Sequence, residues 1–137
     1  MAHKILCAVD GTKHSDRAVE LAAELASKLG SDLTIASVNV LVSGGRGPMI
    51  YAKEDDVVEA AIAAAAKAAE KAGAKNVKQV VLRSREAASG VVAYAEEGKY
   101  DIIVTGTGDK HGLSRLVLGS VAADVAGRAH CTVIVAR

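Results

Sequence analysis

Aromatic residues are almost missing from this sequence. It contains no Phe and no Trp, and its only aromatic residues are Tyr51, Tyr94 and Tyr100. With so few rings, the chain lacks the stacking surface on which proteins hold single-stranded nucleic acid. Its net charge of +1, from 17 basic and 16 acidic residues, also lacks the basic excess of a nucleic-acid-binding protein. We therefore expect no nucleic acid among its partners.

Long apolar runs are missing as well. Each run is far shorter than the ~20 residues that a membrane-spanning helix needs. The opening MAHKILCAVD leads directly into a strand-like run and does not have the pattern of a signal peptide. We expect no membrane-embedded segment and a cytoplasmic location.

Cysteine is scarce, with Cys7 and Cys131 as the two examples, both in apolar, strand-like runs. The sequence has no CxxC motif and no His or Cys cluster with the spacing of metal ligands. These cysteines are interpreted as small buried hydrophobic residues. From the sequence we assign no residue as a metal ligand and none as a catalytic residue.

Half of the residues are apolar, and they alternate between two patterns along the chain. Short continuous apolar runs predict buried strands, and stripes spaced three or four residues apart predict helices. Ser15 is expected to cap the first helix, and Gly30 to close it. The strands are expected at 4–9, 32–40, 77–83, from 102–104 onward and at 131–136, and the other helices at 54–72, 86–97 and 120–130.

This alternation of strands and helices predicts a parallel sheet with right-handed connections. We expect one α/β domain over residues 1–137, with a single open doubly wound sheet of five parallel strands and helices on both faces. Segment 41–50, with three glycines and the only proline, is expected to be a loop. Ligands of such sheets bind beyond the carboxyl ends of the strands, where the strand order reverses.

Residues 106–120, GTGDKHGLSRLVLGS, bring four glycines to such a strand end and lead into a predicted helix. Glycines before a helix N-terminus allow phosphate oxygens to reach main-chain N–H groups. The alternative is a tight strand-to-helix connection without a ligand. The segment has no Walker A ending, and the GxGxxG pattern that starts at Gly106 fails at His111.

Three further stretches are informative: KILCAVDGTKHSDRAVELAAELA, YDIIVTGTGD and LSRLVLGSVAADVAGRAHCTVIVAR. Through them the chain resembles the universal stress protein family along nearly its whole length. The nucleotide motif of that family is G-x-x-G, nine residues, then G-S or G-T, and Gly106, Gly119 and Ser120 match its first and closing positions. The resemblance implies a Rossmann-like fold of the adenine-nucleotide alpha hydrolase type.

The resemblance also implies a binding site for ATP, or for AMP or ADP, with Mg²⁺ as a companion ion. In it, Asp10 would hold the ribose hydroxyls, Val38 would meet the adenine edge through its backbone, and the closing motif would take the phosphates. The implied site residues are Ala8, Val9, Asp10, Val38, Thr105, Gly106, Thr107, Gly108, Asp109, Gly119, Ser120 and Val121.

One motif position departs from the family pattern. The second motif glycine should stand at 109, but the residue there is Asp109, and Gly108 comes one position early. In one outcome Gly108 takes over the close approach, and Asp109 binds Mg²⁺ or faces solvent. In the other, carboxylate repulsion weakens the phosphate site. We expect adenine-nucleotide binding to be retained.

The terminal strand, residues 131–136, is apolar and is expected at a sheet edge, where unpaired backbone groups favour pairing with a second copy. Members of the family that this chain resembles dimerise through that strand, and the resemblance therefore implies a homodimer. The function implied is a stress-response sensor or regulatory module. The alternatives are a dimeric protein-interaction module that binds no nucleotide, with an unknown protein partner, and a slow ATPase.

Overall fold

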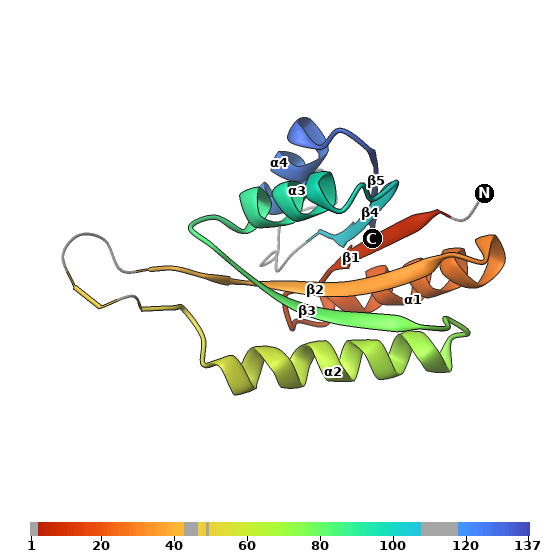
Figure 1. Ribbon diagram of the computed structural model, residues 1–137, viewed down its shortest axis with the longest axis horizontal. Coiled ribbons are helices and arrows are strands. Elements are labelled where there is room, and N and C mark those ends of the chain that lie inside the picture. Colours follow the sequence, from red (N-terminus) through yellow and green to blue (C-terminus); the bar gives the residue numbers. More distant parts are fainter. Residues whose placement is uncertain (1–2, 43–46, 49, 108–117) are drawn as a thin grey trace.

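The computed structural model describes residues 3–42, 47–48, 50–107 and 118–137, and they form one parallel five-stranded sheet flanked by four helices (Figure 1). The order of the strands across the sheet is β3-β2-β1-β4-β5. The strands are β1 Lys4–Ala8, β2 Asp32–Val40, β3 Val77–Ser84, β4 Ile102–Gly106 and β5 Thr132–Ala136. The helices are α1 His14–Leu29, α2 Asp55–Lys71, α3 Ala87–Glu97 and α4 Ser120–Arg128.

The helices form two layers, with α1 and α2 on one face of the sheet and α3 and α4 on the other (Figure 1). From β1 the chain moves outward through β2 to β3, then crosses back and adds β4 and β5 on the other side of β1. The order therefore reverses between β1 and β4. The predicted doubly wound α/β fold is confirmed, and its reversal point is where such folds bind ligands.

The core is built from aliphatic side chains and alanine, as the lack of large aromatic residues requires. Along β1, Ile5 and Cys7 are buried beneath α1 and α2, whereas Leu6 is buried beneath α3. Alanines at the sheet-facing positions of α1 let the helix backbone approach closely. None of the described helices is both long enough and apolar enough to cross a membrane.

Two predicted helix ends are wrong. The first helix begins at His14 with Lys13 at the N-cap position, so Ser15 lies inside the helix, where its hydroxyl bonds Asp10 instead of capping. The last helix ends at Arg128, because the backbone of Ala129 is already extended. His130 therefore lies beyond the helix.

Part of the predicted 41–50 loop continues the sheet. Beyond its pairing with β1, β2 is joined by a segment that runs back antiparallel to it, which we call the return arm (residues 50–53). The Val42 N–H donates to the Ile50 carbonyl and the Ala52 N–H donates to the Val40 carbonyl, both at 2.8 Å. The return arm carries the chain from the tip of β2 back to α2 (Figure 1).

Candidate functional site

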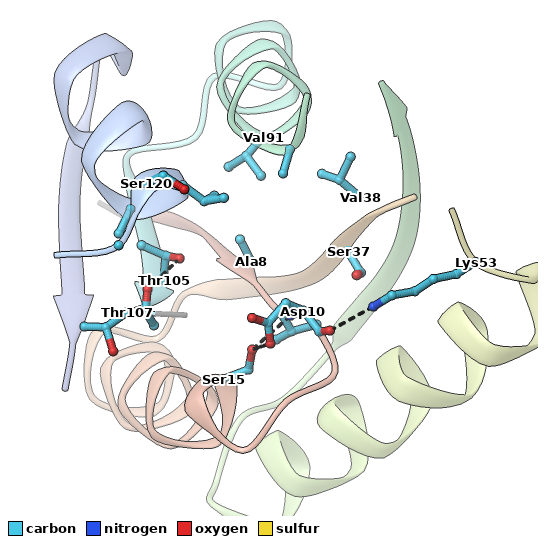
Figure 2. Close-up of a pocket in the computed structure, with 16 residues that line it drawn as sticks. Ala8, Asp10, Ser15, Ser37, Val38, Lys53, Val91, Thr105, Thr107 and Ser120 are labelled. Atoms are coloured by element: carbon cyan, nitrogen blue, oxygen red, sulfur yellow. Dashed lines mark hydrogen bonds between the residues drawn. The ribbon is translucent and has the colours of Figure 1, made fainter. Parts of the chain in front are cut away.

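A pocket of about 280 Å³ opens at the carboxyl ends of β1, β2 and β4, beside the first residues of α4 (Figure 2). Ten of the twelve predicted site residues line it together, and the other two, Gly108 and Asp109, lie outside the described residues. The lining residues are Ala8, Val9, Asp10, Ser15, Ser37, Val38, Lys53, Ala87, Val91, Thr105, Gly106, Thr107, Gly119, Ser120, Val121 and Ala122.

The pocket has an apolar half and a polar half. Figure 2 shows Ala8, Val38 and Val91 on the side of α3, and Asp10 and Lys53 on the side of α1 and α2. Ala8 and Val38 belong to the cluster packed beneath α3, whereas Asp10 lies beyond the end of β1, in the segment that leads to α1. A ligand with a flat apolar part and a hydroxylated part matches this division.

The edge of β2 carries a position at Val38 whose main-chain groups have no partner among the described residues. On one side of it, the Val9 N–H donates to the Ala36 carbonyl at 2.8 Å, and on the other, the Ala52 N–H donates to the Val40 carbonyl. Because peptide groups alternate in direction along a strand, those of Val38 face this same edge. Register pairing with β1 ends at Ala36, so Val38 offers one N–H and one C=O between two occupied positions.

Asp10 is held as a preorganised carboxylate. Its Oδ1 accepts hydrogen bonds from the Thr12 N–H at 2.9 Å, the Thr12 hydroxyl at 2.6 Å and the Ser15 hydroxyl at 2.7 Å. The Asp10 N–H in turn donates to the Ser15 hydroxyl at 2.9 Å, which closes a ring between the two residues.

These contacts decide the ionisation of Asp10. Partial burial by itself would raise the pKa of Asp10, but the hydrogen bonds from Thr12 and Ser15, together with the charge of Lys53, outweigh it. The pKa of Asp10 therefore lies below the ordinary aspartate value. A fixed, ionised carboxylate suits the recognition of hydroxyl groups.

Glycine is required at position 106 because the protein's own backbone passes close to it. A Cβ built at this position would overlap the carbonyl oxygen of His14, at the start of α1. The close approach that requires glycine here is therefore that of α1 to β4. This glycine by itself does not indicate a ligand.

The N-terminus of α4 offers main-chain donors to the pocket. Gly119 takes a φ of 82°, which favours glycine, and no described side chain caps the helix. The first intrahelical bond runs from the Ala123 N–H to the Gly119 carbonyl at 3.0 Å, so the amides of Ser120 to Ala122 precede the ladder. Such amides, with the Ser120 hydroxyl beside them, suit an anionic group.

Six lining residues were not predicted as part of the site. The most informative is Lys53, whose Nζ donates to the Asp10 carbonyl at 3.2 Å. Its approach depends on the return arm, which no motif signals. Ser15 was recognised only as a helix cap, although its spacing from Asp10 is a signal of local hydrogen bonding. The others are Ser37, Ala87, Val91 and Ala122.

The following polar groups, all among the described residues, do not form a second site of this kind. A groove of about 360 Å³ lies between α1 and α2, but its charged lining residues are Asp16 and Glu20, which repel anions. Burial raises the pKa of Cys7 to about 12, and it also raises that of Cys131. His130 lies 3.7 Å from Glu96 on the surface. The described residues contain no group of three or more His, Cys, Asp or Glu that could hold a metal ion.

Comparisons with known proteins agree over the whole chain. The model of the Universal stress protein family matches residues 1–137. The chain is similar to the universal stress protein YxiE of Bacillus subtilis, with 28% identity covering 100% of both chains.

Two solved structures of similar chains contain nucleotides. A universal stress protein in complex with cAMP has 26% identity and a TM-score of 0.77, covering 98% of this chain and 97% of the other. The universal stress protein of Archaeoglobus fulgidus in complex with dAMP has 27% identity and a TM-score of 0.74, covering 98% of both chains.

Proposed function

The chain belongs to the universal stress protein family, and from this we propose that it binds an adenine nucleotide in the pocket between β1, β2 and α4 and acts as a regulatory module. The observation that carries the proposal is the N–H and C=O of Val38, which no described backbone group pairs, at the opposite end of one pocket from the amides of α4. The cAMP and dAMP complexes of two similar chains support it.

In this proposal the base lies in the apolar half. Adenine presents an amino donor beside a ring-nitrogen acceptor on one edge, which is the complement of the C=O and N–H of Val38. The faces of the ring would lie against aliphatic side chains from β1, β2 and α3, including Ala8, Val38 and Val91. The return arm and Val9 bound the edge on either side, so only a narrow, flat group fits between them.

The remaining parts of a nucleotide follow along the pocket. The ribose hydroxyls would donate to Asp10, and the phosphate would accept from the amides of Ser120 and Val121 at the N-terminus of α4. The volume of about 280 Å³ is near the lower end of the ~300–1,000 Å³ typical of ligand pockets, which suits a mononucleotide with an exposed phosphate tail.

We also propose that two copies pair through β5. This strand lies at the edge of the sheet, and among the described residues its ladder is with β4 alone. A second copy related by a two-fold axis would satisfy its outward peptide groups. We therefore expect the protein to act as a dimeric nucleotide sensor in the cytoplasm.

Calorimetric titration with AMP, ADP and Mg²⁺-ATP tests the proposal. We expect saturable binding to the wild type and roughly tenfold weaker binding to Asp10→Asn, because the ribose hydroxyls lose a charged acceptor. Asp32→Asn, which removes an exposed carboxylate at the opposite end of the sheet, is the matched control and should bind as the wild type does. No heat from any of these nucleotides at millimolar concentration would favour the alternative, a protein-interaction module.

A further inference from the structure

Lys53 has no assigned part in the proposed binding site, although it lies at the rim of the polar half. Among the described lining residues it is the one with a positively charged side chain. Figure 2 shows this side chain reaching from the return arm toward Asp10, on the far side of Asp10 from Ser120. A phosphate at the N-terminus of α4 would therefore lie away from Lys53, and the ribose would lie near it.

A buried amide fixes the base of this side chain. Asn39 is fully buried, and its side chain donates to the Lys53 carbonyl at 2.8 Å and accepts from the Lys53 N–H at 3.1 Å. Both main-chain groups of Lys53 are thus held to β2. The rotamers of Lys53 therefore start from a fixed point at the pocket rim.

The hydrogen bonds of Asp10 leave one carboxylate oxygen for a ligand. All three described hydrogen bonds to this side chain fall on Oδ1. Oδ2 can therefore accept from a hydroxyl, and the ammonium of Lys53 is held close by through the Asp10 carbonyl. A sugar hydroxyl both donates and accepts, so a carboxylate can accept its proton while an ammonium on the same side donates to its oxygen.

We propose that Lys53 is a specificity-determining residue, which donates to the ribose diol while Asp10 accepts from it, and so selects ribonucleotides over deoxyribonucleotides. The inference rests on the proposed adenine-nucleotide function. A deoxyribose leaves Lys53 without the oxygen that it would contact, and a site built to hydrogen-bond a hydroxyl discriminates against an analogue that lacks it.

Titration of AMP, 2′-deoxy-AMP and 3′-deoxy-AMP into three proteins tests this inference. The proteins are the wild type, Lys53→Met and Lys75→Met, the last removing an exposed lysine just before β3, at the other end of the sheet. We expect the wild type and Lys75→Met to prefer AMP over at least one deoxy analogue by roughly tenfold, the worth of a hydrogen bond to a charged group. In Lys53→Met that preference should fall to about twofold or less through weaker AMP binding.

The outcomes separate this inference from the function on which it rests. If the wild type binds none of the three ligands, the proposed function fails. If it binds AMP but Lys53→Met keeps the wild-type preference over both analogues, only the role of Lys53 is overturned. Equal weakening of all three ligands by Lys53→Met also overturns it, because general attraction of the phosphate would then explain the effect.

Discussion

The packing around Gly106 makes a prediction at the scale of a single residue. A Cβ at this position would overlap the His14 carbonyl, which belongs to the backbone and cannot move aside without shifting α1. We expect Gly106→Ala to lower the free energy of unfolding by about 1–3 kcal/mol, the usual cost of overpacking. Urea unfolding measures the change.

Gly127, near the end of α4, gives the matched control, because a Cβ there would meet no atom within 4 Å. Alanine is a better helix former than glycine, so Gly127→Ala should raise the free energy of unfolding by about 0.5–1 kcal/mol. The same substitution therefore has opposite signs at the two glycines. Equal effects at both would contradict the close approach of α1 to Gly106.

The ring of hydrogen bonds between Asp10 and Ser15 makes a prediction about pH. The hydrogen bonds from Thr12 and Ser15, with the charge of Lys53, hold the pKa of Asp10 below its ordinary value, so their stabilisation is complete above the ordinary aspartate pKa, about 3.9, and is lost as the pH falls through the lower folded value. Ser15→Ala should raise the pKa of Asp10, as an NMR titration of its carboxyl group would report. The loss of stability in this variant should be largest near pH 7 and should shrink in acid.

Individual site residues differed in how far the sequence could predict them. Asp10 and Val38 could be placed, because Asp10 follows the first apolar run, Val38 lies in the second, and a family resemblance supplied a role for each. Lys53 could not, because its place depends on a contact with Asn39 fourteen positions away in the sequence. Whether the predicted residues bind a nucleotide stays a prediction.

The return arm is the element on which this placement depends. Asn39 bonds both main-chain groups of Lys53 from a fully buried position, so Asn39→Ala removes two hydrogen bonds and leaves a small cavity. We expect a loss of about 1–3 kcal/mol in the free energy of unfolding. In this variant the Ala52 and Lys53 amides should also exchange hydrogen faster than in the wild type, and the increase should be larger than that at the β2 amides.

The exposed Gln79 of β3 is the control for this element, and Gln79→Ala should leave both measurements close to the wild type. Unchanged exchange at Ala52 and Lys53 in Asn39→Ala would show that other contacts hold the return arm. Arg83 is the obvious candidate, because its side chain lies over the ring of Tyr51 and pairs with Asp55 at 2.9 Å.

The helices and strands themselves were predictable to within a few residues. Buried strands of a parallel sheet are continuous apolar runs, and the alanine stripe of α2 has the period of a helix. The start of α1 was misplaced because a serine at a helix start usually caps it. In this protein the Ser15 hydroxyl is engaged by Asp10, so local competition between two hydrogen-bond partners decided the boundary.

At the scale of the whole molecule, the edge strand β5 allows a test of the proposed dimer. The Thr132 N–H donates to the Asp101 carbonyl at 3.3 Å, on the side of β4, so by alternation the peptide groups of Val135 face outward. Val135→Pro should remove an outward donor and keep the ladder with β4. Analytical ultracentrifugation should find a dimer for the wild type and a monomer for this variant.

Ile134→Lys is a companion variant, because it disturbs the side chain that packs on the α1 face and leaves the outward peptide groups in place. It should lower stability more than it changes association. A wild-type chain that sediments as a monomer at high concentration would contradict the proposed pairing.

The strand edge at Val38, left without a partner by the part of the chain that the structure describes, has a consequence for how such a protein can diverge over evolutionary time. Codon changes replace one side chain with another, but they leave the peptide group itself intact, except where proline is introduced. Recognition carried by peptide groups at Val38 and at the first residues of α4 would therefore persist while the amino acids there drift. Two chains with few residues in common could then keep the same ligand, provided that their strands still end in the same places.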